Sequence, residues 1–206
     1  MTASYDVTAY RDADFARFGI DLPGFLDRAV AKRRAEYLAG RVLARQALEF
    51  FGHSDAEVGR GDKGEPLWPA GVQGSLSHSH GTVGAWVGID GALLGLDIEA
   101  LADTRAARAI RHSVLTTEDL ARLGPDPDAM TCTAIFSAKE ALYKALYPRV
   151  QQFFGFDHAN VVATGAEGVT LCLAQSLANG IPAGLTIDIA QQWQAGRVIS
   201  RCEFAP

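Results

Sequence analysis

A stretch with helical periodicity followed by strand-like segments occurs twice in this chain of 206 residues. The first helix is predicted over residues 26–51, where apolar residues recur mostly at three- and four-residue steps. The second is predicted to begin at Asp128, a good N-cap, and to end at Tyr147, before Pro148. This order favours an α+β fold with a pseudo-two-fold arrangement of two similar α/β halves, each a small antiparallel sheet packed on a long helix.

The predicted strands set the boundary between the two halves. Residues 82–88 and 92–98 are strand-like and are separated by an Asp90-Gly91 turn, which predicts a hairpin. We expect residues 1–98 to form the N-terminal half and residues 99–206 the C-terminal half. In the C-terminal half, two shorter helices precede the long helix and four strands follow it, over residues 101–114, 117–124, 161–163, 169–173, 185–190 and 198–204.

Charge is unevenly distributed along the chain. Nineteen basic and 24 acidic residues give a formal net charge of −5, which argues against a general nucleic-acid binder. Residues 28–45 nevertheless contain six basic residues and one acidic residue, Glu36, so this segment carries +5 and the rest of the chain −10. Because so few acids are available to pair with these cations, the basic helix predicts a local anionic ligand.

The cysteines and the apolar segments indicate a cellular setting. Cys132, Cys172 and Cys202 lie far apart with no C-x-x-C pair, so neither a disulfide framework nor a zinc site is predicted. Residues 1–10 lack a secretion-signal pattern, and no apolar stretch approaches the ~18 residues that a membrane span requires. We expect a cytoplasmic protein with no membrane span, which acts as a monomer because both halves lie in one chain.

Three carboxylates are candidates for a metal site. Asp97 and Glu99 lie one residue apart on a predicted strand, so both point to one face, and they repel each other unless one is protonated or a cation lies between them. Magnesium suits such a site. Glu140 adds a third carboxylate, and Lys144 shares its helix face. Convergence of these groups would place Lys144 where a cation meets a phosphate, whereas Lys139 faces elsewhere and is expected to be solvated.

Simpler interpretations of these residues remain open. Asp97 and Glu99 could form a solvated strand end, and Glu140 with Lys144 could be an exposed ion pair worth a few tenths of a kcal/mol. The polar run at residues 75–81 has two functional interpretations, a transition-metal pair formed by His78 and His80 or a phosphate site formed by Ser77 and His78. No further His or Cys nearby completes a metal set, so the phosphate site is favoured.

Four blocks of sequence, in this order, resemble the Sfp-type 4′-phosphopantetheinyl transferases, and in particular the enterobactin synthase component D subgroup. The first is KRRAEYLAGR at residues 32–41, and the second joins GEPLWP at 64–69 to GSLSHS at 74–79. The third is GLDIE at 95–99, and the fourth is FSAKEALYK at 136–144. Each block alone is weak, whereas the ordered set is specific.

The resemblance implies transfer of the phosphopantetheine arm of coenzyme A to a serine of an apo acyl or peptidyl carrier protein. The reaction releases 3′,5′-ADP and serves siderophore or other secondary-metabolite synthesis. By the same resemblance, Asp97, Glu99 and Glu140 hold Mg²⁺, Glu140 is also the base for the carrier serine, directly or through water, and Lys144 contacts the pyrophosphate. The residues that hold coenzyme A are then Arg41, Arg60, Lys63, Ser77, His78, Asp97 and Lys144.

Carrier proteins of this kind are acidic, so a basic helix is a candidate docking surface. The predicted helix 101–114 carries Arg105, Arg108 and Arg111, although an ordinary solvated helix would show the same residues. Two other functions remain open. A magnesium-dependent nucleotide or pyrophosphate hydrolase would use the same carboxylates and cations, and a non-catalytic coenzyme A-binding module would use the cations alone.

Overall fold

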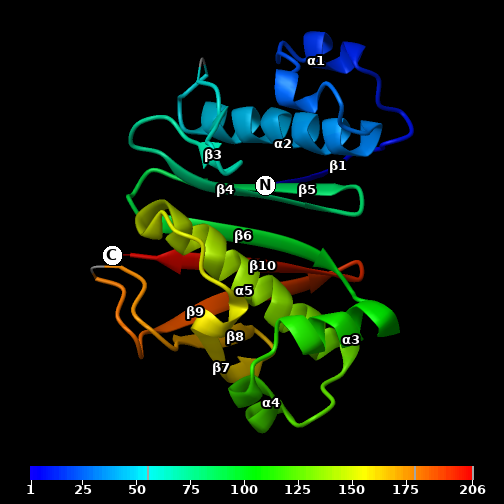
Figure 1. Cartoon of the computed structure of the whole chain (residues 1–206). Helices are drawn as coiled ribbons and strands as arrows, with labels where there is room; N and C mark the ends of the chain where they lie inside the picture. The colour runs from blue at the N-terminus through cyan, green and yellow to red at the C-terminus, as the bar shows by residue number, and fades with distance from the viewer. Residues whose placement is uncertain (55, 179, 206) are drawn as a thin grey trace. The chain divides into compact units, whose positions relative to one another are not determined.

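The computed structural model describes residues 1–54, 56–178 and 180–205. The chain divides into two compact units, Met1–Asp90 and Gly91–Pro206. Each unit contains an antiparallel sheet with one long helix packed against it (Figure 1), which confirms the α+β class. Among the described residues, no helix is both long enough and apolar enough to cross a membrane.

The first unit is organised by helix α2, Ala31–Phe50, which packs against a three-stranded sheet of order β1-β5-β4. Leu48, at 0% exposure, and its helix neighbours meet the apolar face of β5. The helix begins five residues later than predicted because Val30 is extended and Gly24–Leu26 form a separate 3₁₀ turn. The other elements are β1 (Thr2–Ser4), α1 (Ala13–Arg17), β2 (Gly59–Arg60), β3 (Pro66–Leu67), β4 (Gln73–Ser79) and β5 (Thr82–Gly88).

The second unit is organised by helix α5, Ala129–Val150, which packs on a five-stranded antiparallel sheet of order β6-β10-β9-β8-β7. The predicted N-cap is confirmed, because the Asp128 side chain accepts a hydrogen bond from Thr131 N at 2.7 Å. Pro148 lies in the last helical turn, so it does not stop the helix where predicted. The other elements are β6 (Leu93–Ala100), α3 (Thr104–Ser113), α4 (Thr117–Leu123), β7 (Ala159–Gly165), β8 (Gly168–Leu173), β9 (Thr186–Gln194) and β10 (Arg197–Phe204).

The hairpin predicted between residues 82–88 and 92–98 is wrong. Strand β5 pairs instead with β4 through a turn at His80 and Gly81, both of which have positive φ angles, as tight hairpin turns require. Strand β6 pairs with β10, so that Asp97 lies opposite Ser200. The Asp90-Gly91 signal marks a local turn correctly, but local pattern does not reveal a partner strand about 100 residues away.

Helix α5 approaches strand β6 most closely at Gly95. A Cβ atom at this position would lie 1.9 Å from the carbonyl oxygen of Ala141 and 2.7 Å from the amide nitrogen of Ala145. Both atoms belong to the helix backbone, so neither can move aside as a flexible side chain would. Glycine is therefore required for this distance between helix and strand.

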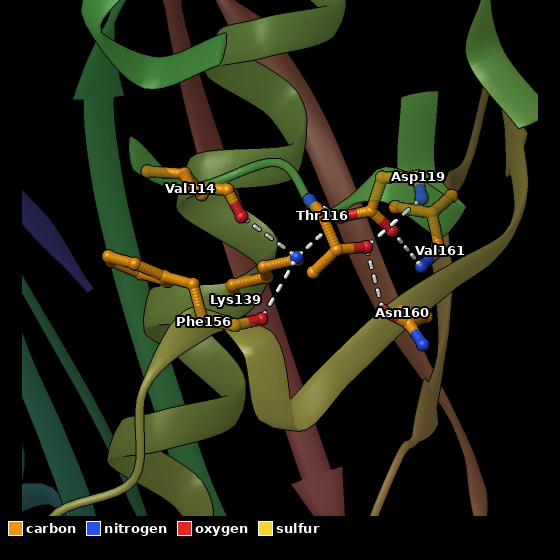
Figure 2. A network of polar contacts seen from close by, with 7 residues as sticks. All are labelled: Val114, Thr116, Asp119, Lys139, Phe156, Asn160 and Val161. Atoms are coloured by element: carbon orange, nitrogen blue, oxygen red, sulfur yellow. Dashed lines mark hydrogen bonds and ion pairs between the residues drawn. The ribbon is translucent and has the colours of Figure 1, made fainter. Parts of the chain in front are cut away.

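A buried ion pair joins α5 to the segments around it, as Figure 2 shows. The Lys139 ammonium donates to Asp119 Oδ2 at 2.6 Å, to Val114 O at 3.1 Å and to Phe156 O at 3.0 Å. Burial lowers the pKa of Lys139, and the bond to Asp119 opposes that shift. With an exposed fraction of 3%, Lys139 is not the solvated side chain that its position in the sequence suggested.

The Asp119 carboxylate accepts two further hydrogen bonds in the same network. Its Oδ1 accepts from Val161 N at 2.6 Å and its Oδ2 from Thr116 N at 3.0 Å, and the second bond forms the capping box of α4. Thr116 in turn donates to Asn160 Oδ1 at 2.8 Å (Figure 2). One ion pair thus joins α4, α5 and β7 with every ammonium hydrogen matched to an acceptor.

We predict that Lys139→Met lowers the free energy of unfolding by about 3–5 kcal/mol, because it leaves the Asp119 carboxylate buried without its cation. Urea denaturation provides the measurement. The matched control is Lys32→Met, since the Lys32 side chain is 67% exposed and lies 3.9 Å from Glu36. That change should cost less than about 1 kcal/mol, and equal losses in the two variants would contradict the importance given to the buried pair.

We predict that Gly95→Ala lowers the free energy of unfolding by more than about 2 kcal/mol, because the added methyl group meets helix backbone. Gly165→Ala in β7 is the control, since a Cβ there meets nothing within 4 Å, and it should change stability by less than about 1 kcal/mol. Urea denaturation of both variants checks the prediction, which fails if they are equally stable.

Candidate functional site

One face of strand β6 carries Gly95, Asp97 and Glu99, because side chains two residues apart share a face. The close approach at Gly95 turns this face toward α5. The same register aligns Ala141 and Ala145 with the glycine, and each is the residue directly after Glu140 or Lys144 in the helix. The helix–strand contact therefore places two predicted site residues of α5 beside a predicted site strand.

Asp97 and Lys144 form an ion pair within this contact. Lys144 Nζ donates to Asp97 Oδ1 at 2.7 Å and to Leu96 O at 3.2 Å. The Asp97 side chain is 4% exposed and that of Lys144 is 27% exposed. Part of the lysine side chain therefore remains accessible to solvent. An aspartate and a lysine that are 47 residues apart in sequence are thus brought together.

Glu140 lies close enough to this pair to interact with both charges. Burial raises the pKa of Glu140, the Asp97 carboxylate raises it further, and the Lys144 ammonium opposes the shift. A carboxylate with a raised pKa accepts a proton more readily than an ordinary surface carboxylate. The arrangement can therefore hold a cation or take up a proton beside a lysine.

The described residues contain no group of three or more His, Cys, Asp or Glu side chains placed to share a metal ion. The repulsion between Asp97 and Glu140 that contributes to the raised pKa of Glu140 is nevertheless what a divalent cation would relieve. Oxygen donors from carboxylates are also the ligands that magnesium prefers, so this pair fits the ion.

A pocket of about 240 Å³ opens next to Glu140. Four of its nine lining residues are aromatic, and the ring of one of them, Phe156, lies 5.8 Å from that of Phe136. Phe156 also supplies one of the carbonyl groups that bind Lys139, so the buried ion pair fixes part of the pocket wall. The lining residues are Lys139, Glu140, Leu142, Tyr143, Phe153, Phe154, Gly155, Phe156 and Ala159.

In the first unit, strand β4 presents Ser77 and His78 to opposite faces. Ser77 is buried and His78 is partly exposed, as the two-residue period of a strand requires. His78 lies 3.2 Å from Arg33 Nη1 and 3.8 Å from Glu36 Oε1. These side chains border a pocket of about 400 Å³ whose lining is Val30, Lys32, Arg33, Glu36, His78, Ser79 and His80.

The arginines of α2 divide into two groups. Arg34 binds Asp12 at 2.6 Å and Leu26 O at 3.0 Å, and Arg45 donates to Phe18 O. These two arginines hold the N-terminal segment against the helix. Their structural contacts explain much of the positive charge of the helix without a ligand.

Arg41 and Arg60 make no ion pair among the described residues, and the exposed Lys63 lies in the loop that follows Arg60. Sequence reasoning assigned no role to Arg33, which the structure places against His78. The spacing in the sequence could have indicated this position, because Arg33, Tyr37 and Arg41 are four residues apart and so share one helix face.

Helix α3 carries the three arginines predicted as a docking surface. Arg105 and Arg108 are exposed, whereas Arg111 lies 3.8 Å from Asp126. The helix is capped by Asp103, whose side chain accepts from Ala106 N at 2.8 Å. Two of the three predicted residues are therefore presented to solvent on a capped helix.

Two family descriptions match the chain. The 4′-phosphopantetheinyl transferase N-terminal domain matches residues 23–88, and the 4′-phosphopantetheinyl transferase superfamily matches residues 93–191. The second match spans β6, with Asp97 and Glu99, and α5, with Glu140 and Lys144.

Individual relatives agree with these matches. The 4′-phosphopantetheinyl transferase PptT of Mycobacterium tuberculosis is 34% identical over 75% of this chain and 73% of its own length. Enterobactin synthase component D of Salmonella typhimurium is 36% identical over 84% and 73%, respectively. The 4′-phosphopantetheinyl transferase Svp of Streptomyces mobaraensis is 35% identical over 82% and 70%. The chain accordingly belongs to the 4′-phosphopantetheinyl transferase superfamily.

Proposed function

We propose that the chain transfers the phosphopantetheine arm of coenzyme A to a serine of an apo carrier protein, with Asp97, Glu140 and Lys144 at the centre of the reaction. The observation that carries this assignment is the ion pair between Asp97 and Lys144 beside Glu140, a partly buried glutamate of raised pKa. The relatives named enterobactin synthase component D support a role in siderophore synthesis. The three free thiols support a reducing, cytoplasmic setting, and we propose that a single chain acts alone.

Each residue has a distinct part in the proposed reaction. The serine hydroxyl of the carrier attacks the phosphorus next to the pantetheine arm, the bond to the bridging oxygen of the pyrophosphate breaks, and 3′,5′-ADP leaves. Glu140 takes the serine proton, directly or through water, and its raised pKa suits it to do so. Lys144 offsets negative charge that develops on the pyrophosphate.

Asp97 and Glu140, with Glu99 completing the set, are the residues proposed to hold Mg²⁺. When bound, the ion supplies the positive charge that lets a pyrophosphate lie beside carboxylates. In the first unit, Arg41, Arg60, Lys63 and His78, with Ser77 beside His78, are proposed to bind the phosphates of coenzyme A. The partial exposure of His78, and the lack of an ion pair at Arg41 and Arg60 among the described residues, support that part of the assignment.

We predict that the purified chain, with magnesium, coenzyme A and an apo peptidyl carrier protein, increases the mass of the carrier by one phosphopantetheine arm. Mass spectrometry of the carrier detects the product. A mixture without carrier should release no 3′,5′-ADP, whereas a magnesium-dependent hydrolase would release it. Unchanged mass across several carriers, including one from a siderophore synthetase, would contradict the transferase.

Glu140→Gln is the decisive variant in this assay, and its transfer rate should fall by at least about 100-fold. Because burial raises the pKa of Glu140, its charge lowers stability at any pH above the folded-state pKa. The neutral glutamine should therefore melt at the same temperature or higher at pH 7.5 without magnesium, which separates loss of activity from loss of fold. Full activity in this variant would overturn the assigned base.

We also propose that the acidic carrier docks on α3 through Arg105 and Arg108. Reversing both charges to glutamate should raise the KM for the carrier by about tenfold at low salt, with a smaller effect at high salt, and leave the KM for coenzyme A unchanged. Arg122→Glu on α4 is the control, since Arg122 is also exposed and lies in a last helical turn. An unchanged KM for the carrier in the double variant would exclude this surface.

A further inference from the structure

Two arginines and two aromatic rings of the first unit form one continuous set of contacts. The Arg60 guanidinium lies 4.3 Å from the centre of the Phe25 ring, and the Arg41 guanidinium lies 4.7 Å from that of Tyr37. The two rings contact each other edge to face, with centres 5.4 Å apart. The four residues come from three separate segments, the 3₁₀ turn Gly24–Leu26, helix α2 and strand β2.

A hydrogen bond from Arg41 also joins this set of contacts to the backbone of strand β2. Arg41 Nη2 donates to Gly59 O at 2.9 Å, and Gly59 directly precedes Arg60 in strand β2. The short strand is thus held to α2 through its backbone and to the 3₁₀ turn through the Arg60 side chain. The positions of the two guanidinium groups are consequently coupled through one small set of contacts.

The kind of contact used here distinguishes these arginines from their neighbours. Arg34 is held by the Asp12 carboxylate, which neutralises its charge. An aromatic ring holds a guanidinium through one face and leaves its charge uncompensated and its N–H edge open to a second partner. Arg41 Nε is buried with no hydrogen-bond partner among the described residues, which is costly unless a ligand supplies an acceptor.

We propose that Phe25 and Tyr37 are positioning residues that hold Arg60 and Arg41 in place for the phosphate groups of coenzyme A. The proposal rests on the proposed function, which assigns those phosphates to the two arginines. Neither arginine forms an ion pair with a carboxylate in the described part of the chain, an arrangement that favours an anionic ligand. The role also accounts for Phe25, whose ring is 46% exposed and covers the guanidinium of Arg60.

The test is the affinity for 3′,5′-ADP measured by isothermal titration calorimetry, which requires neither carrier nor turnover. Phe25→Leu and Tyr37→Leu should each raise the dissociation constant by about three- to tenfold, the range expected for loss of one cation–π contact. Phe25→Tyr and Tyr37→Phe keep a ring at each position and should bind as the wild type does. In turnover, the leucine variants should raise the KM for coenzyme A and leave kcat unchanged.

The chain contains a matched control for loss of an aromatic ring. Arg17 lies 5.8 Å from the ring centre of Phe18, which is 40% exposed and lies in the same unit. Phe18→Leu removes a comparable contact elsewhere and should leave the affinity for 3′,5′-ADP unchanged. Melting temperatures of all variants show whether any change in affinity reflects a loss of fold.

Arg41→Ala and Arg60→Ala separate failure of this inference from failure of the proposed function. If both alanine variants bind 3′,5′-ADP as the wild type does, the phosphate assignment itself is wrong. If they weaken binding while the two leucine variants do not, the assignment holds and the positioning role is wrong. Equal weakening in Phe25→Leu and Phe25→Tyr would also overturn the role, because the ring would then not be what matters.

Discussion

The distance between α5 and β6 at Gly95 is the constraint on which the site in the second unit depends. With no side chain at this position, the backbone of the helix contacts the strand, and residues that flank the contact lie within reach of each other. Asp97 and Lys144 therefore pair at 2.7 Å, and the carboxylate of Glu140 lies within the field of both. A wider spacing would separate these charges and weaken every interaction between them.

In each unit, the contacts of a cation separate structural cations from those that remain available. In the second unit, Lys139 and Lys144 are each matched to a buried carboxylate, Asp119 and Asp97, but their environments differ. Lys139 is enclosed by three acceptors and performs a structural task, whereas Lys144 keeps an open side. In the first unit the same division separates Arg34, which an acid neutralises, from Arg41, which an aromatic ring supports. Partner chemistry thus distinguishes structural cations from those available to a substrate.

Local features were predictable from the sequence, and features that depend on distant segments were not. The Asp128 cap and the four C-terminal strands follow from nearby residues, and both are confirmed. The ordered motifs also identified the family and the residues of the proposed site. The burial of Lys139 could not be predicted, because its three hydrogen-bond acceptors come from three other segments of the chain. The convergence of Glu99 with the other two carboxylates remains a proposal.

The pairing of β6 with β10 has a consequence for the order of events during synthesis. The strand that carries Asp97 is made near the middle of the chain, whereas its partner, Arg197–Phe204, is made about 100 residues later. Until those residues leave the ribosome, that edge of β6 has no native neighbour in the sheet. Pairings between such distant segments form slowly because loop closure costs entropy. The strand that carries Asp97 therefore gains its partner strand late in synthesis. A nascent chain has most of its helices before it has a complete site.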